Sequence, residues 1–188
     1  MAKTRSMTTT ADAVFKPNQL VTLVQKTPAE HIKSRQGRGG KTFRYVTTSY
    51  VQSILNTVFG WGWSFEVKDK GQSPDGSSVW VLGKLTILNP KTQQPMIVKE
   101  QFGSSEIKKS NGKEVDYADD MKSAASDSLK KAASLLGVCA DLYADPETAS
   151  EINAKAEQVR DILVQMRKKE AEAEKAENEE QVNLQEQE

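Results

Sequence analysis

The spacing of apolar residues predicts a mixed fold in the middle of the chain. Residues 48–59 place four apolar side chains on one helical face and stop at Gly60, as an amphipathic helix does. Residues 61–69, 78–88 and 95–103 then alternate apolar and polar positions, which is typical of strands with one buried face. Because only short polar turns separate these strands, we expect an antiparallel meander. Three strands are not stable alone, so the sheet needs a helix on one face.

Residues 117–137 supply the predicted helix for that face, and their alanines permit a close approach to the sheet. Acids stand near the start of this helix and lysines in its later turns, an order that the helix dipole favours. These residues are Asp119, Asp120, Lys130 and Lys131. The expected fold class is therefore α+β, with an antiparallel three-stranded meander packed on a long helix as a βββα core.

Composition divides the 188 residues into four segments. Residues 1–15 are rich in threonine and are expected to be disordered, and residues 16–145 are expected to form one domain. Residues 146–170 predict a C-terminal helix with an apolar seam of two heptads, too short for an independent coiled coil, so we expect it to lie on its own domain or on a neighbour. The seam consists of Ile152, Ala156, Val159, Leu163 and Met166. Residues 171–188, rich in Glu and Gln, are expected to form an acidic disordered tail.

The formal net charge of zero conceals a division between a basic body and an acidic end. Residues 1–145 carry 20 basic and 14 acidic side chains, whereas residues 146–188 carry 6 and 12. A basic body with an acidic tail is a common plan among proteins that bind nucleic acid. A solvated surface with a disordered end would give the same counts, so charge alone leaves both interpretations open.

Composition also excludes several kinds of site. The single cysteine and the single histidine, Cys139 and His31, cannot form a disulfide framework or a structural zinc site. The start of the chain has no apolar signal core, and no apolar run is long enough to span a membrane. We therefore expect a cytoplasmic protein with no metal site and no membrane contact.

Motifs for catalysis and for cofactors are missing as well. Residues 39–42 read GGKT, but Arg35 stands where a phosphate-binding loop needs its first glycine. The acidic pair Asp119 and Asp120 opens a helix, where capping and the helix dipole account for it. We expect a protein that is not an enzyme and binds no cofactor. A metal-dependent nuclease stays open as an alternative, because its carboxylates could converge from separate elements.

The segment that says most about function is glycine-rich and basic. Between residues 33 and 44 it carries five basic side chains and no acid, and its three glycines predict a mobile loop. The basic residues are Lys33, Arg35, Arg38, Lys41 and Arg44, and the glycines are Gly37, Gly39 and Gly40. Arginine and lysine neutralise phosphates, and aromatic rings stack on unpaired bases. We expect Phe43 to pack in the core and Tyr45 either to pack there or to stack on a base. Lys130 and Lys131 are expected to extend the same groove.

Four blocks of sequence, in this order, resemble the Rad52 family of single-strand annealing proteins and its bacterial and phage relatives. SRQGRGGKTFRYV (34–46) resembles the family's entry segment of an arginine, a glycine run and aromatics. YVQSILNTVFGWGW (50–63) resembles its helix that ends in Phe-Gly near a tryptophan. A strand over 79–88 leads to FGSSE (102–106), and MKSAASDSLKKAASLLG (121–137) resembles its alanine-rich helix.

The resemblance implies a βββα core that assembles into a ring or a helical oligomer, with single-stranded DNA in a basic groove. The family anneals complementary strands without ATP, in homologous recombination and double-strand break repair. The expected DNA-binding residues are Arg35, Arg38, Lys41, Arg44, Tyr45, Lys108, Lys109, Lys122, Lys130 and Lys131. The chain departs from the family at Ser134, where a third basic residue is expected one turn after the lysine pair. Lys122 and Arg38 are candidates to replace that charge.

The expected partners are single-stranded DNA and further copies of the chain, together with a single-strand binding protein or another recombination partner. Two other classes of function remain open beside annealing. One is the metal-dependent nuclease or another DNA-processing enzyme. The other is a module that recruits proteins through its acidic tail and does not bind DNA.

Overall fold

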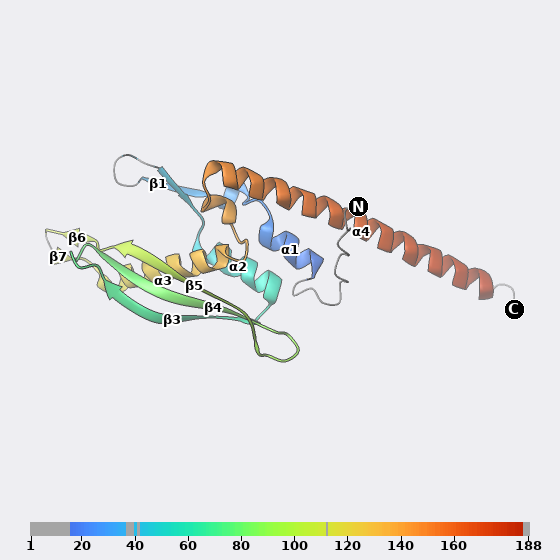
Figure 1. Cartoon of the computed structure of the whole chain (residues 1–188), viewed down its shortest axis with the longest axis horizontal. Helices are drawn as coiled ribbons and strands as arrows, with labels where there is room; N and C mark the ends of the chain where they lie inside the picture. The colour runs from blue at the N-terminus through green and yellow to red at the C-terminus, as the bar shows by residue number, and fades with distance from the viewer. Residues whose placement is uncertain (1–15, 37–39, 41, 112, 186–188) are drawn as a thin grey trace, which may run out of the picture.

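The computed structural model describes residues 16–36, 40, 42–111 and 113–185 and shows a three-stranded sheet with a long helix across one face (Figure 1). A second long helix runs along the body and extends well beyond it (Figure 1). The α+β class that the sequence predicts is confirmed. The segment 1–15, predicted to be disordered, lies outside the described residues.

The sheet consists of β3 (Trp63–Gln72), β4 (Ser78–Leu88) and β5 (Pro95–Glu106), which pair antiparallel and in sequence order. The predicted meander is therefore confirmed. Along β4, the alternate positions that the predicted strand pattern places on one face are all buried: Val79, Val81, Gly83, Leu85 and Ile87. On the other face, the rings of Trp80 and Phe102 pack edge to face, with 5.7 Å between their centroids.

Helix α3 (Tyr117–Ser134) packs across β4 and β5 at short range, because small residues line both surfaces. A Cβ atom on Gly103 would fall against backbone atoms of Ala124 and Ser128. The buried Ser128 hydroxyl donates a hydrogen bond of 2.8 Å to the carbonyl oxygen of Gln101. These contacts determine how deeply α3, with its lysines, lies on the sheet.

The main core forms where α1 (Pro17–Val24) and α2 (Thr48–Phe59) pack against the sheet and α3. Helix α2 has the bounds that its apolar spacing predicts, and the Thr47 hydroxyl caps it by accepting the Tyr50 N–H at 3.2 Å. Each fully buried leucine contributes roughly 1.5–3 kcal/mol relative to an exposed one. Buried leucines of four elements meet here: Leu23, Leu55, Leu85 and Leu129.

The residues that flank the glycine run form an antiparallel hairpin, an element that the sequence did not predict as such. Strand β1 (Lys33–Gln36) pairs with β2 (Thr42–Tyr45), and the hairpin projects from the body (Figure 1). Gly40, near the turn, has a φ of 74°, which glycine adopts without strain. The predicted mobile loop falls mainly on residues 37–39, which lie outside the described residues.

Side-chain contacts hold the base of this hairpin to the body. The Thr27 hydroxyl and N–H donate to the two carboxylate oxygens of Asp141 at 2.6 and 3.2 Å. The ring of His31 stacks on that of Tyr50 with 3.9 Å between centroids. Both contacts lie beside 3₁₀ turns, namely η2 (Ala29–His31) and η4 (Ala140–Leu142). The segment entering β1 is therefore tied both to α2 and to the chain that follows α3.

Helix α4 (Pro146–Gln185) is longer than the sequence predicts, since we expected it to end at residue 170 and to be followed by a disordered tail. Alanine, glutamate, glutamine and lysine dominate the added stretch, and their high helix propensity is the physical reason for the difference. Of the predicted apolar seam, Ala156 is buried and Leu163 is half-buried beside α1. The seam therefore lies on the chain's own domain.

Candidate nucleic-acid interface

The hairpin presents two different faces. Lys33 pairs with Tyr45 across the strands. Two positions along, Arg35 pairs with Phe43. Cross-strand partners and alternate residues share a face, so these four side chains lie on the same side of the hairpin. Arg44, between the two aromatic residues, lies on the opposite side.

The face with Tyr45 is turned toward the second half of α3. The Nζ atom of Lys130 lies 5.8 Å from the centroid of the Tyr45 ring, within reach of a cation–π contact. Burial is the main cause that lowers the pKa of Lys130. Asp127 opposes this shift, while the charges of Arg35 and Lys131 lower the pKa further. We call Arg35, Tyr45 and Lys130 the hairpin–helix cluster.

Lys131 has different surroundings from its neighbour Lys130. Its Nζ atom lies 2.9 Å from Oδ2 of Asp127, and that oxygen also accepts the backbone N–H of Ser104 at 3.1 Å. The hydrogen bond from Ser104 thus holds Asp127 against β5, and the ion pair with Asp127 holds the Lys131 ammonium group beside it. Lys131 shares its charge with an acid, whereas Lys130 lies over an aromatic ring.

The side chain of Phe43 is 49% exposed, although strand alternation led us to expect it in the core. That expectation was wrong because the two-stranded hairpin extends away from the body (Figure 1), and its outer part is not packed against another described helix or strand. Tyr45, next to the buried Val46 at the hairpin base, is half-buried. Both rings retain accessible surface on the face that carries Arg35, where unpaired bases could stack.

A second group of lysines lies at the N-terminal end of α3, and acids pair with it. The Nζ atom of Lys108 lies 2.8 Å from a carboxylate oxygen of Asp119 and 3.6 Å from one of Asp120. The Nζ atom of Lys122 lies 3.9 Å from Oδ1 of Asp119. The hydrogen bond and the charge of Asp119 raise the pKa of Lys108. We call Lys108, Asp119, Asp120 and Lys122 the paired cluster.

Asp120 is the buried member of the paired cluster, with no exposed surface. Its Oδ2 atom accepts the backbone N–H of Lys108 at 3.0 Å, while its Oδ1 atom has no hydrogen-bond partner among the described residues. The side chain that caps α3 is that of Asp116, which accepts the Asp119 N–H at 2.9 Å. Besides suiting the helix dipole, Asp120 therefore ties the end of β5 to the start of α3.

The remaining predicted site residues do not join the hairpin–helix cluster. Lys109 lies on β6 (Lys109–Ser110), which pairs with β7 (Lys113–Glu114) in a short hairpin. Lys122, a candidate to replace the charge missing at Ser134, lies about 18 Å from that position along the helix and within the paired cluster. Two predicted residues lie outside the described part of the chain: Arg38 and Lys41.

Two residues at this interface were not among the predicted site residues. Lys33 shares the hairpin face with Arg35 and Tyr45, and alternation along the strand would have indicated it. Asp127 pairs with Lys131, and its position four residues earlier on a helix is the signal for that contact.

The comparison with known families agrees with this architecture. The family described as Rad52/22 family double-strand break repair protein matches residues 16–160. The chain therefore belongs to this family. At the family level, its members act in DNA repair and recombination, anneal strands and are generally not enzymes. No curated protein matches the chain.

Two further findings concern the described ranges only. No helix within them is long and apolar enough to cross a membrane. Nor do three His, Cys, Asp or Glu side chains gather within them as a metal ion would require.

Proposed function

We propose that the chain binds single-stranded DNA along the face formed by the β1–β2 hairpin and the second half of α3, and anneals complementary strands without ATP. The hairpin–helix cluster is the observation that carries this proposal, because it sets two cations beside an accessible aromatic ring. Cations suit phosphates and a ring suits the face of an unpaired base. A duplex offers phosphates but hides its base faces, so the combination favours a single strand.

Annealing at such a site needs no covalent step. Cations hold the DNA backbone through counterion release, so affinity falls with salt by a log–log slope of about 0.7 per phosphate contact. Stacking on an aromatic ring contributes about 1–3 kcal/mol per base. Duplex stacking yields about 1.4 kcal/mol per step, so a few paired steps outweigh the hold of one ring. A complementary strand would therefore displace the bases from the protein as pairing proceeds.

Assembly into a ring or a helical oligomer is the second part of the proposal. A single copy offers few contacts to DNA, and copies in a row add such contacts along one strand. β3 and β5 are the two edges of the main sheet, and each strand of the β1–β2 hairpin has one partner. Among the described residues, these strands have no second strand partner, so their outer edges are open to pairing with a neighbouring copy, which supports assembly through strand edges.

Annealing of labelled complementary oligonucleotides, with EDTA and without nucleotide, tests the proposal. We expect the chain to accelerate annealing and Arg35→Ala to slow it. Lys68→Ala is the matched control, because Lys68 lies away from the cluster on β3, 3.5 Å from Glu66. Equal losses in the two variants would contradict the site and indicate an effect of net charge alone.

The same protein and labelled oligonucleotides distinguish annealing from the two other classes of function. Cleavage of the oligonucleotides that depends on a divalent metal would identify a nuclease. Failure to bind single-stranded DNA at low salt would identify a protein-recruiting module instead.

A further inference from the structure

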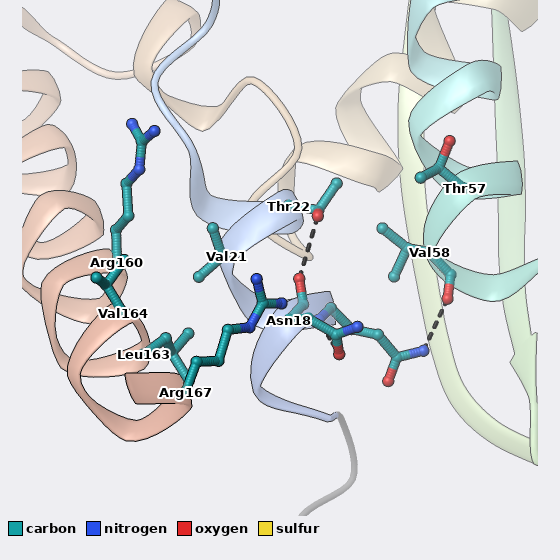
Figure 2. A pocket seen from close by; sticks show the side chains of 10 residues that line it. Asn18, Val21, Thr22, Thr57, Val58, Arg160, Leu163, Val164 and Arg167 are labelled. Atoms are coloured by element: carbon teal, nitrogen blue, oxygen red, sulfur yellow. Dashed lines mark hydrogen bonds between the residues drawn. The ribbon is translucent and has the colours of Figure 1, made fainter. Parts of the chain in front are cut away.

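A groove of about 500 Å³ lies between α1, α2 and α4, away from the hairpin–helix cluster. Its apolar surface comes from all three helices and includes Val21, Val58 and Leu163. Figure 2 shows Arg167 extending from α4 toward α1, and Arg160 extending alongside α4 on the same side of the groove. The groove thus combines apolar surface with two cationic side chains.

The charges of the groove are unbalanced. None of its lining residues is acidic, and within the described ranges no ion pair involves Arg160 or Arg167. The two arginines are seven residues apart on one helix, a separation of about 10 Å along its axis. A fitting occupant carries two carboxylates at a similar separation, with an apolar side chain between them.

The C-terminal segment of the chain has this chemistry. Residues 170–188 contain eight glutamates and one lysine. Within them, Glu179, Val182 and Glu186 are spaced three and four residues apart. On α4 the same two intervals separate Arg160, Leu163 and Arg167.

The part of this segment that the structure describes, which ends at Gln185, does not reach the groove of its own copy. Helix α4 is continuous from Pro146 to Gln185, so Leu163 and Val182 are about 28 Å apart along its axis. The second half of α4 projects beyond the body (Figure 1). It is therefore placed to meet a neighbouring molecule.

We propose that the groove between α1, α2 and α4 receives the acidic C-terminal segment of a second copy. Glu179 and Glu186 of that copy pair with Arg160 and Arg167, and Val182 packs against Leu163. Because the groove and the segment are different surfaces, this contact is heterologous and joins copies head to tail, into a closed ring or an open helix. The inference rests on the self-association in the proposed function and is independent of its DNA site.

Charge reversal in the full-length chain tests the contact, with assembly size measured by sedimentation and light scattering. We expect Arg160→Glu with Arg167→Glu to raise the concentration at which assemblies dissociate by roughly tenfold or more. Glu179→Arg with Glu186→Arg should have the same effect. The chain with all four substitutions should assemble again, because the charges are complementary once more.

Lys155→Glu with Lys168→Glu is the matched control, since both lysines are exposed on α4 and neither lines the groove. It makes the same change of charge and should leave assembly unaltered. Circular dichroism and thermal melting identify any variant that fails to fold, and the fourfold variant then decides whether the charges act as pairs.

Four outcomes would overturn the inference, and three of them concern assembly alone: the arginine reversal is the only variant that disrupts assembly, the fourfold variant stays dissociated although folded, or no variant alters assembly. The first would show that another part of the neighbour fills the groove. Loss of DNA binding by the arginine variant with assembly intact would also overturn it, and would identify the groove as a DNA site. Failure of wild-type annealing, with the charge-reversal results as expected, would instead contradict the proposed function alone.

Discussion

The two ends of α3 both carry lysines, but their surroundings are opposite. At the hairpin end, Lys130 lies over the ring of Tyr45. Burial lowers the pKa of Lys130, and the charges of neighbouring cations lower it further. At the N-terminal end, Lys108 and Lys122 lie within ion-pair distance of Asp119. At the hairpin end, Lys130 is therefore not matched by an ion pair among the described residues, whereas Lys108 and Lys122 at the other end are matched by acids.

The difference follows from the helix itself. The dipole and the exposed N–H groups favour acids in the first turn, and Asp119 and Asp120 stand there. Those acids attract the lysines that come near. Later turns lack this reason to carry acids, so their lysines remain available unless a specific residue such as Asp127 pairs with them. Position along the helix, more than the number of lysines, therefore decides which lysines are paired with acids.

The largest effect, on stability, is expected from a substitution that displaces the whole of α3 and so alters the surroundings of both its ends. Gly103→Val would press a side chain against the backbone of Ala124 and Ser128. Overpacking at a site without room costs about 3 kcal/mol of unfolding free energy, or roughly 6–12 °C in Tm for a domain of this size. A thermal melt measures this, with the exposed Ser104→Ala on the same strand as control. Equal Tm values for the two variants would show that the helix does not depend on the close approach.

A smaller but more selective effect is expected from the lysine pair. Lys130→Ala should reduce affinity for oligo-dT by about tenfold, because it removes a phosphate contact and the cation beside Tyr45. Lys131→Ala should reduce it less, since Asp127 already shares that charge. The double variant Lys130→Ala with Lys131→Ala should lower the affinity for oligo-dT and flatten its dependence on salt. Fluorescence anisotropy measures all three, and a Lys131→Ala loss as large as that of Lys130→Ala would contradict the distinction.

The lowered pKa of Lys130 predicts a dependence on pH. Lys130 loses its proton at a lower pH than an ordinary lysine, so its contribution to phosphate binding disappears first as the pH rises. Below the usual pKa of a lysine, affinity for oligo-dT should therefore fall with rising pH more steeply in the wild type than in Lys130→Arg, because arginine stays charged. Parallel profiles for the two proteins would show that Lys130 does not titrate at the DNA.

The smallest effect on DNA is expected at the paired cluster. Lys108→Ala removes a cation held by Asp119 and should leave affinity for oligo-dT within about twofold, as for other exposed ion pairs. Its effect should appear in stability instead, as a lower Tm, because Asp120 loses the nearest cation. A DNA defect equal to that of Lys130→Ala would remove the contrast between the two ends.

Local patterns predict the sheet, α2 and α3 well, because burial on one face leaves a period in the sequence. The alternation along β4 and the helical spacing of α2 lead directly to the observed elements. Phe43 was misplaced because alternation shows which residues share a face, but not whether another layer covers that face. The end of α4 was misplaced because Glu-rich composition is shared by disordered tails and by exposed helices.

The site was predictable as a set of residue types and not as a set of contacts. Arg35, Tyr45 and Lys130 were all expected at the groove, and their meeting depends on a hairpin folding beside a helix far away in sequence. The pairing of Lys108 with Asp119 joins a strand end to a helix start, which no local spacing encodes. Charge counts alone therefore do not reveal that the lysines at the N-terminal end of α3 are paired with acids.

The salt dependence of binding to oligo-dT tests the central claim most directly, with two double variants that remove equal charge. Arg35→Ala with Lys130→Ala should lower the slope of log affinity against log salt by about 1.4, the value for two lost phosphate contacts on a single strand. Lys108→Ala with Lys122→Ala should leave the slope at its wild-type value. Equal slopes for the two double variants would contradict the claim that the hairpin end of α3 holds the DNA.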